Sequence, residues 1–542
     1  MSSEPTAAFA DLWELVYDEL DSRGETDRDA LVIFGRDERG TGRRTFAELE
    51  ENANRFAAHL RSLGVGHGDR VALYLENRPE YLEALLGSYK VRASPINVNF
   101  RYVESELAHL LGDCAAKVVL HEQHFAKPLA TVRDQLPDVE HTIEMDGAFD
   151  EILAASDPTR VDVERSGDDH YILYTGGTTG LPKGVVWRQE DAFYSCLGGG
   201  DPTRMMGQVE RVDELPERIV DAYNGMLLAP FMHAAGSWVT VMINLAGGKA
   251  ILPRGPLDAE LVWDTVDAEQ AHMMTVIGDA VGRPVLEAWL ANPGRWDAGS
   301  LFAMSNGGAP MSAALKTRIA ETFPSLILTD GFGSSEAGTQ GTSRLSAEAV
   351  KAAKGVAQFE PGDDTTAVLD ADDRPLEPGS PETGRVARTG RLPLGYLNDE
   401  KKTAETFVTI DGTRWLITGD LARVAADGTI ELLGRDSATI NTGGEKVHGE
   451  EVENVLKAHP SVYDVVVVGA PDERWGSRVT AVVQPVPGEE PTLDELSAYC
   501  RSELAGFKVP KSLVLVDEVV RSPAGKADLG WAKSMAAEGA RT

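Results

Sequence analysis

The chain has 542 residues, of which 42% are hydrophobic and 25% are charged, a composition typical of a soluble globular protein. It is too long for one hydrophobic core, which predicts three or four units of about 150 residues each. The net charge of −34 argues against binding to a nucleic-acid backbone or to an anionic membrane surface, and it fits solubility or a salty cytoplasm.

The cysteines and the apolar stretches indicate a cytoplasmic protein. Cys114, Cys196 and Cys500 are far apart and form no pair with metal-ligand spacing, which indicates buried free thiols in a reducing compartment. The N-terminus has neither a basic start nor an apolar core, so we expect no export signal. Residues 226–246 are the most membrane-like stretch, but they contain polar residues such as His233, and we interpret them as a buried helix that lines a pocket.

The first part of the chain alternates signals for helix and strand. Residues 1–43 contain an opening helix and an acidic loop, and Thr45 with Glu48 then forms a capping box at the start of an amphipathic helix that ends at Gly64. The elements expected next are a strand at residues 71–75, a helix at 79–91 and a strand at 118–121, while residues 134–168 are acidic and rich in loop signals. Strands that alternate with helices predict a parallel sheet covered on both faces.

A strand at residues 171–174 runs into a turn that is rich in glycine and threonine. The turn contains Gly176, Gly177 and Gly180, hydroxyls from Thr175, Thr178 and Thr179, and the cation Lys183. Glycine brings backbone N–H groups close to a ligand, and amides, hydroxyls and one lysine at a strand end suit a polyphosphate. The stretch is not a Walker loop, because no glycine has Gly-Lys-Ser/Thr five residues on. Taken alone, a turn of this composition is more often a plain surface loop.

The middle of the chain contributes a histidine and a turn of small residues. Residues 195–222 form an irregular excursion that could cover a site, and His233 follows on an apolar segment, where a lone histidine is usually a core residue. Trp238 either lines a pocket or belongs to the core. Residues 303–308 read as a strand that ends in a glycine turn and a helix, and the small side chains there would let a flat base or an acyl chain pack against backbone at Gly307, Gly308 and Ala309.

Residues 326–336 are the second informative stretch. After a strand the stretch reads Gly-x-Gly, which is the start of a dinucleotide-binding motif. The sixth position of that motif is Glu336, however, and a carboxylate there would repel a pyrophosphate. With a metal ion between them, the same carboxylate becomes favourable. No Gly-x-Gly-x-x-Gly follows a strand, so we reject a Rossmann oxidoreductase.

The last two hundred residues divide into a β-rich part and an α+β part. Residues from about 345 to 434 are rich in Gly, Thr and Pro with short alternating runs, which predicts a small β subdomain. Within it, Asp420 follows a glycine turn, and a carboxylate in that place suits two vicinal ribose hydroxyls. After Arg435, strand and helix signals alternate again, and Lys526 lies in a Pro- and Gly-containing turn near the C-terminus, where a lysine is usually only a solvated loop residue.

Together these stretches closely resemble the adenylate-forming superfamily of acyl-CoA synthetases, luciferases and nonribosomal-peptide adenylation domains. The resemblance runs from about residue 45 to about residue 530, with its motifs in the expected order, and is nearest to acyl-CoA synthetases of the actinobacterial type. It implies an α/β fold with a large N-terminal domain, residues 1–434, made of two covered α/β sheets and a small β subdomain. A small mobile α+β C-terminal domain, residues 435–542, carries Lys526.

The resemblance also implies roles for individual residues. Catalysis falls to Lys526, Glu336 and His233, with His233 orienting the acyl carboxylate, and Mg²⁺ is held by Thr178 and Glu336. The nucleotide and coenzyme A contacts are implied for Thr175, Gly176, Gly177, Thr178, Thr179, Gly180, Lys183, Gly307, Gly308, Ala309, Asp330, Gly331, Phe332, Gly333, Ser335, Asp420, Arg435, Gly443, Gly444 and Lys446.

Four positions depart from the superfamily's usual pattern. Phe332 stands for Tyr beside adenine and Ser335 for Thr, and these keep the ring face and the hydroxyl. Ser437 stands at the hinge where relatives carry Asp or Lys, and Gly449 replaces a common Pro. Asp330 is expected to accept a hydrogen bond from the adenine amino group.

The function implied is a two-step ligase that uses ATP, Mg²⁺ and coenzyme A. The carboxylate of a small-molecule acid attacks the α-phosphate of ATP, and a thiol then displaces AMP from the acyl-adenylate. A fatty or steroid-derived acid and coenzyme A are expected, with no membrane span and with a homodimer as a possible assembly. The alternatives are an enzyme that loads a separate carrier protein and a nucleotide-binding module without catalysis.

Overall fold

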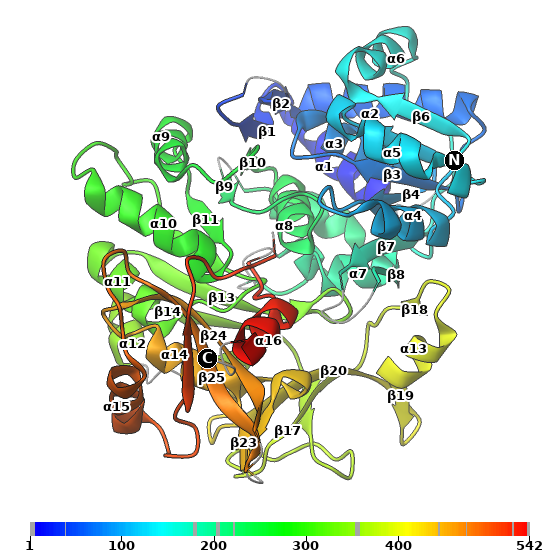
Figure 1. Cartoon of the computed structure of the whole chain (residues 1–542). Helices are drawn as coiled ribbons and strands as arrows, with labels where there is room; N and C mark the ends of the chain where they lie inside the picture. The colour runs from blue at the N-terminus through cyan, green and yellow to red at the C-terminus, as the bar shows by residue number, and fades with distance from the viewer. Residues whose placement is uncertain are drawn as a thin grey trace.

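A computed structural model describes residues 6–37, 40–176, 181–201, 206–220, 223–352, 358–442, 445–472, 474–522 and 525–538 (Figure 1). Within these residues the strands form one large sheet, three smaller sheets and a two-stranded ribbon. No helix among them is long and apolar enough to cross a membrane. The mixed α/β class expected from the sequence is confirmed.

The first small sheet is parallel, as the alternating pattern predicted. Its order is β4-β3-β5-β6, from β3 (Arg70–Tyr74), β4 (Ser94–Asn97), β5 (Val118–His121) and β6 (His141–Glu144). The helices of this part are α1 (Phe9–Arg23), α2 (Phe46–Ser62), α3 (Pro79–Lys90), α4 (Glu104–Asp113), α5 (Ala126–Val132) and α6 (Asp150–Ala155). The Thr45–Glu48 capping box forms as expected. Residues 134–168 were expected to be loop, which is wrong for β6 and α6. Both elements are short, so they show little periodic pattern in the sequence, and packing stabilises them.

Fourteen described strands form the large sheet, whose centre is parallel. These parallel strands are β1 (Asp29–Phe34), β10 (Lys249–Pro253), β9 (Asn224–Leu227), β11 (Met273–Val276), β12 (Ala303–Asn306) and β13 (Ile327–Ser334), and β2 (Gly42–Thr45) pairs antiparallel at the edge. Both faces are covered: Ala250 and Leu252 belong to one apolar cluster, and Ile251 between them belongs to another. The covering helices include α8 (Ala234–Leu245), α9 (Ala259–Glu269), α10 (Gly278–Ala291) and α11 (Ala313–Thr322).

The β-rich stretch expected at 345–434 continues this sheet. From β13 the order runs outward through β14 (Gly338–Leu345), β15 (Gln358–Pro361), β21 (Ile430–Arg435), β20 (Thr413–Val424), β17 (Gly384–Arg388) and β16 (Thr366–Leu369), while β19 (Phe407–Ile410) pairs with β20. Two short helices, α12 (Ala347–Ala352) and α13 (Glu400–Thr406), accompany these strands. The pairing is antiparallel from β13 through β14 and β15 to β21.

Another sheet supports the glycine- and threonine-rich turn. It consists of β7 (His170–Thr175), β8 (Lys183–Arg188) and β18 (Gly395–Tyr396), followed by α7 (Gln189–Ser195). The stretch 226–246 was expected to be one helix, but it consists of the end of β9, a turn and α8. The chain turns here because His233 is in an extended conformation at the N-terminus of α8.

The C-terminal part folds around a sheet that is apolar on both faces. Its strands are β24 (Val462–Asp472), β25 (Gly476–Pro485) and β26 (Ser512–Leu515), and its helices are α14 (Gly449–Leu456), α15 (Leu493–Glu503) and α16 (Leu529–Glu538). Val465 and Val467 pack with α14 and α15, and Val466 and Val468 pack with α16. This is why the run of four valines is continuous rather than alternating. The ribbon of β22 (Ile440–Thr442) and β23 (Glu445–Val447) leads into α14.

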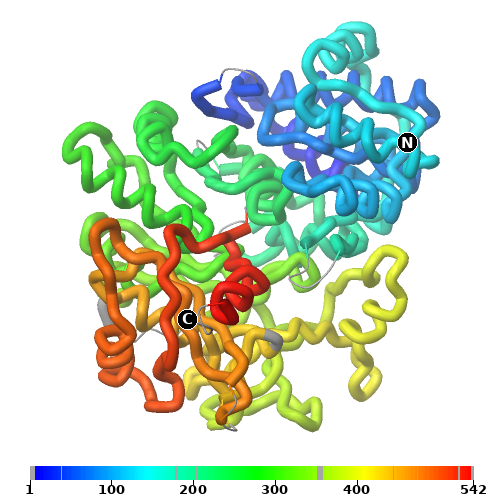
Figure 2. Tube along the Cα trace, viewed as in Figure 1, coloured from blue at the N-terminus to red at the C-terminus, as the bar shows by residue number. Residues whose placement is uncertain are grey.

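The C-terminal part lies against the large sheet and its helices. In Figure 2 the orange and red segments occupy the same side of the molecule as the green segments around residue 300. A hydrogen bond confirms the contact: Asn454 in α14 accepts from the backbone N–H of Ala313, at the start of α11, at 3.2 Å.

Candidate active site

The glycine- and threonine-rich turn connects two antiparallel strands. Thr175 at the end of β7 pairs with Lys183 at the start of β8, so both lie at the mouth of the turn with Gly176. The side chain of Lys183 forms an ion pair with Asp399, and its amino group lies 6.0 Å from the centre of the Tyr396 ring. The predicted contacts Gly177, Thr178, Thr179 and Gly180 lie outside the described residues.

The amide of Asn97 fixes the strand that carries this turn. Its Oδ1 accepts from the N–H of Tyr174 at 2.8 Å, and its Nδ2 donates to the carbonyl of Tyr174 at 2.9 Å. The same Nδ2 donates to the carbonyl of Met232 at 2.7 Å. One side chain at the end of β4 therefore ties the turn to the residue before His233. The sequence pattern predicted no chemistry for this region.

His233 is placed at the N-terminus of α8 with its ring directed into protein. The Nε2 atom is buried and has no hydrogen-bond partner among the described residues. Burial, followed by the charges of Lys526 and Arg101, lowers the pKa of His233 to about 4. The ring is therefore neutral near pH 7, and a neutral imidazole with a free nitrogen can orient an oxygen of a ligand.

The predicted turn of small residues follows β12 as expected. Gly308 adopts a left-handed backbone, φ +80°, and a side chain at Gly307 would meet no atom within 4 Å. Asn306, just before the turn, donates to Asp330 at 2.9 Å, and Lys316 forms an ion pair with the same carboxylate. Asp330 is therefore held by two protein groups, and its predicted contact with the adenine amino group stays a prediction.

Strand β13 directs alternate residues to opposite sides. Gly331 and Gly333 are exposed, whereas the Phe332 ring is 8% exposed and lies 5.4 Å from the Phe359 ring, in the apolar cluster of the β-rich stretch. The predicted stacking of Phe332 on adenine stays a prediction. A Cβ at Gly333 would lie 2.1 Å from the carbonyl oxygen of Gly338, so only glycine fits this bulge.

The chain turns after β13 at Ser335 and Glu336, and two aromatic side chains hold this turn. Trp187 donates from its indole N–H to the carbonyl of Ser335 at 3.0 Å, and the Tyr396 hydroxyl donates to a carboxylate oxygen of Glu336 at 3.0 Å. Burial and the charge of Glu336 raise the pKa of Tyr396, which keeps its proton and so remains a donor. Tyr396 thus links Glu336 to β18, which pairs with β8, the strand that follows the glycine- and threonine-rich turn.

Asp420 and Arg435 face each other on paired strands. They are directly opposite in the register of β20 and β21, and Arg435 Nε lies 3.3 Å from Asp420 Oδ1. The two residues therefore form one polar unit, although they are fifteen positions apart in the chain. Such a pair can bind hydroxyl groups as both acceptor and donor.

Lys526 enters the same region from the C-terminal part. Burial and then the charge of Arg435 lower the pKa of its amino group, whereas the carboxylates of Glu336 and Asp420 act in the opposite direction. The amino group is thus within the electrostatic reach of all three predicted site residues, and also of His233. This is the observation that joins the two ends of the chain in one site.

The loop of Lys526 makes a close contact with the N-terminal part. Gly525 has φ +68°, and a Cβ there would lie 2.9 Å from Ile277 Cγ2 and 3.0 Å from the Ile277 carbonyl oxygen. Ala309 also borders this position. The small residues next to Lys526 and in the turn after β12 therefore allow the two parts to meet without a side chain between them.

Not every predicted residue is gathered here. Lys446 is exposed on β23, in the C-terminal part of the chain. Gly443 and Gly444 lie outside the described residues. The sequence did not reveal the roles of Trp187 and Asp399, because they act through a backbone carbonyl and an ion pair. Each nevertheless stands beside a recognisable motif.

The gathered groups fit a nucleotide triphosphate and a divalent cation. Lys183, Lys526 and Arg435 are cations that suit phosphate oxygens, and in a chain of net charge −34 they supply the local positive potential. The Glu336 carboxylate is a hard oxygen ligand of the type that Mg²⁺ prefers. These residues therefore offer cations to phosphate oxygens and a carboxylate to a divalent cation.

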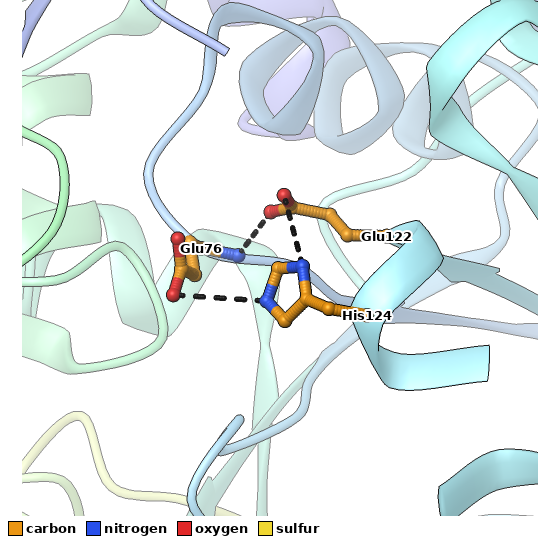
Figure 3. Close-up of side chains that lie close together, drawn as sticks. All are labelled: Glu76, Glu122 and His124. Carbon is orange, nitrogen blue, oxygen red and sulfur yellow. Dashed lines mark hydrogen bonds and ion pairs between the residues drawn. The ribbon is translucent and has the colours of Figure 1, made fainter. Parts of the chain in front are cut away.

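A second cluster of acidic and histidine side chains lies elsewhere, and arginine side chains form ion pairs with it. Glu76, Glu122 and His124 approach one another after β3 and β5 (Figure 3). Arg254 forms ion pairs with Glu122 and, at 3.1 Å, with Glu76, while Arg78 lies 3.6 Å from Glu122. Two guanidinium groups already neutralise the carboxylates, so the cluster ties the first small sheet to the end of β10.

Comparisons with known proteins agree with this geometry. A family model described as AMP-binding enzyme matches residues 20–396, and one described as AMP-binding enzyme C-terminal domain matches residues 451–526. The chain is 43% identical to a medium/long-chain-fatty-acid–CoA/3-oxocholest-4-en-26-oate–CoA ligase of Mycobacterium marinum, over 94% of this chain and 93% of the relative. It is also 43% identical to a 3-oxocholest-4-en-26-oate–CoA ligase of Rhodococcus rhodochrous, with the same coverage.

Solved structures show the same fold. An anthranilate CoA ligase in complex with anthranoyl-AMP matches with a TM-score of 0.81 at 21% identity, over 98% of both chains. A fatty acyl CoA synthetase of Mycobacterium tuberculosis matches with a TM-score of 0.69 at 26% identity, over 96% of this chain and 97% of that one. The resemblance found in the sequence is confirmed: the chain belongs to the family of AMP-binding enzymes.

Proposed function

We propose that this protein is an AMP-forming acyl-CoA ligase that acts on a fatty or steroid-derived acid. The observation that carries the proposal is the close approach of the Lys526 loop to Ile277 and Ala309, which brings the Lys526 ammonium within electrostatic range of Glu336 and of the Asp420–Arg435 pair. Such a site can bind ATP and stabilise charge on its α-phosphate. The substrate class rests on the relatives, which are named as ligases of medium- and long-chain fatty acids and of a steroid acid.

In the first step the acid's carboxylate oxygen bonds to the α-phosphorus, and the bond to the β-phosphate breaks, releasing pyrophosphate. Neutral His233 orients the carboxylate, Lys526 stabilises the negative charge at the α-phosphate, and Lys183 with the neighbouring turn binds the outer phosphates. Mg²⁺, held by Glu336 and Thr178, would neutralise phosphate charge. Asp420 and Arg435 bind ribose.

In the second step the thiol of coenzyme A bonds to the acyl carbon, and AMP leaves. We infer that the C-terminal part, residues 435–542, rotates at Ser437 and presents the segment around Lys446 to the site in place of Lys526. The position of Lys446 outside the gathered residues supports this. The alternative acceptor of the acyl group is the thiol of a separate carrier protein.

We further propose that the protein works in the cytoplasm. The three cysteines are buried and form no disulfide, which suits a reducing compartment. The homodimer considered from the sequence stays a prediction, and light scattering would decide it.

Acid-dependent exchange of pyrophosphate into ATP tests the first step, and AMP release with coenzyme A tests the second. The panel should contain short, medium and long fatty acids, aromatic acids and a steroid acid. Exchange together with coenzyme-A-dependent release confirms the ligase and identifies its acid. Exchange without that release indicates a carrier-protein acceptor, and no exchange with any acid refutes the proposal.

A further inference from the structure

A row of charged side chains connects the two parts of the molecule and ends at the loop of Lys526. Lys457, which follows α14, has its amino group 3.7 Å from Asp279 Oδ2 in α10 and 3.8 Å from Asp464 Oδ1 in β24. Arg521 donates to both oxygens of Asp464, at 2.7 and 2.8 Å. Four side chains thus link α10 to the C-terminal loop.

The link across the two parts is buried. The side chains of Lys457 and Asp279 are 7% and 5% exposed. A buried charge that loses its partner is strongly unfavourable, because it loses the compensation for the water it gave up. The charges of Lys457 and Asp279 therefore compensate each other only when the two parts are docked as they are here. When the parts separate, water must hydrate both groups.

The row continues into the backbone next to the lysine. Arg521 Nη1 donates to the carbonyl of Gly525 at 3.0 Å, and Gly525 is the residue that meets Ile277 at close range. The N–H of Lys526 donates to the hydroxyl of Ser522 at 3.2 Å. The guanidinium thus fixes the loop relative to Asp464, and a shift of Lys457 would move the loop with the rest of the C-terminal part.

The links of the row differ in length. Arg521 donates hydrogen bonds to Asp464, whereas the amino group of Lys457 lies beyond hydrogen-bond distance of both Asp464 and Asp279. Asp279 Oδ2 is buried and has no hydrogen-bond partner among the described residues. On the N-terminal side, Asp279 Oδ1 is fixed by the N–H of Ser312 at 2.7 Å. Asp279 is therefore fixed to the N-terminal part, and its contact with Lys457 is the link of the row that must separate when the two parts move apart.

We propose that Asp279 and Lys457 are positioning residues for the first step: their contact holds the C-terminal part in the orientation that places Lys526 at the α-phosphate, and it opens for the thiol step. The proposal rests on the proposed function. Other charged groups face the pair, namely Arg283, at 3.7 Å from Asp279, together with Glu453 and Glu450 of α14. Arg283 also packs over the Tyr463 ring at 5.2 Å, so it belongs to the same interface.

The kinetic test compares the two half-reactions in Lys457→Met and Asp279→Asn. Asparagine keeps an oxygen for the Ser312 N–H, so the start of α11 is preserved. We expect each variant to lose about tenfold in pyrophosphate exchange and to keep the conversion of supplied acyl-adenylate by coenzyme A within about twofold. The double variant should lose little more than either single one, because the two changes remove the same contact.

Two further variants separate positioning from folding. Lys249→Met removes a lysine that is 15% exposed and pairs with Glu269 at 2.8 Å inside the N-terminal part, and we expect both half-reactions to keep the wild-type ratio. Lys457→Arg retains the charge and should restore exchange. Equal loss of both half-reactions in Lys457→Met, or undiminished exchange, would overturn the proposal.

A measurement without substrate keeps this inference separate from the proposed function. Spin labels at Ala291→Cys and Ser502→Cys, both exposed, report the distance between the parts, and the native cysteines are buried. We expect one dominant distance in the labelled wild-type background and a broader distribution with Lys457→Met. An unchanged distribution refutes the positioning role even if the enzyme is active. If the wild-type protein shows no pyrophosphate exchange with any acid, only the proposed function is refuted.

Discussion

At the residue scale, the candidate site contains side chains that stand in motifs and side chains that hold the motif residues in place. Lys526, Glu336 and Asp420 stand in short patterns whose resemblance to the superfamily implies their roles, and these roles stay predictions. Asn97, Trp187 and Asp399 hold the same site through backbone carbonyls and an ion pair. Such roles leave no pattern in the chain, because any residue with the right group at the right place serves.

Lys526 is the residue whose loss should separate the two steps most sharply. Lys526→Ala removes the ammonium that we propose to act at the α-phosphate, so we expect pyrophosphate exchange to fall by roughly 10²–10³. Conversion of supplied acyl-adenylate to the thioester should stay near the wild-type rate, because in the proposed mechanism the lysine is withdrawn for that step. Quenched-flow assays of each half-reaction measure this, with the exposed Lys533→Ala as control. Equal loss of both steps would contradict the withdrawal.

His233 should make the protein less stable in mild acid. Its pKa is about 4 in the folded chain and about 6.5 in an unfolded one, so the unfolded state binds more protons between these values. Stability therefore falls as the pH drops from 6.5 to 4, by roughly 2–3 kcal/mol from this group, and is unaffected above 6.5.

His233→Asn tests this because asparagine does not titrate. We expect the free energy of unfolding, measured in urea, to fall from pH 7.5 to pH 4.5 in both proteins. The fall should be roughly 2–3 kcal/mol smaller in the variant than in the wild type. An equal loss in the two proteins would show that His233 is not the group responsible.

At the element scale, local patterns located elements better than they located partners. The capped helix after Thr45 and the alternation of strands and helices after Arg435 were predicted and are confirmed. The helix expected at 226–246 is wrong because apolar content alone does not distinguish β9 from α8. The sequence also did not reveal that β15 pairs with β14 and so continues the large sheet, since strand pairing depends on contacts far apart in the chain.

The bulge between β13 and β14 depends on one glycine. Gly333→Ala would place a methyl group 2.1 Å from the Gly338 carbonyl, so the strands must separate next to Ser335 and Glu336. We expect a loss of about 2–4 kcal/mol in unfolding free energy and weaker ATP binding. Urea unfolding and calorimetry with ATP measure the two effects.

The matched control for this substitution is Gly66→Ala. Its added Cβ meets no atom within 4 Å, and its φ lies outside the left-handed region. We expect Gly66→Ala to change stability by less than about 1 kcal/mol. A similar small effect for Gly333→Ala would mean that the bulge tolerates a side chain.

At the scale of the whole molecule, the charge balance is the dominant property. Asp and Glu number 86 against 52 Lys and Arg, so the folded chain carries −34 at pH 7. Compacting like charges costs free energy, and dissolved salt reduces this cost because the screening length falls from about 10 Å at 0.1 M to about 3 Å at 1 M. The unfolded chain spreads the same charges further apart and gains less from screening.

Salt should therefore stabilise this protein. We expect the midpoint of thermal unfolding to rise by several degrees, on the order of 5 °C, between 0.05 and 1 M NaCl, most of it at the low end where the screening length changes fastest. Sucrose at equal osmolality is the control, because it changes water activity without screening. An increase equal to that in sucrose, or a midpoint that does not move, would show that self-repulsion does not limit stability and that local ion pairs such as Arg160–Asp18 already balance the surface charge.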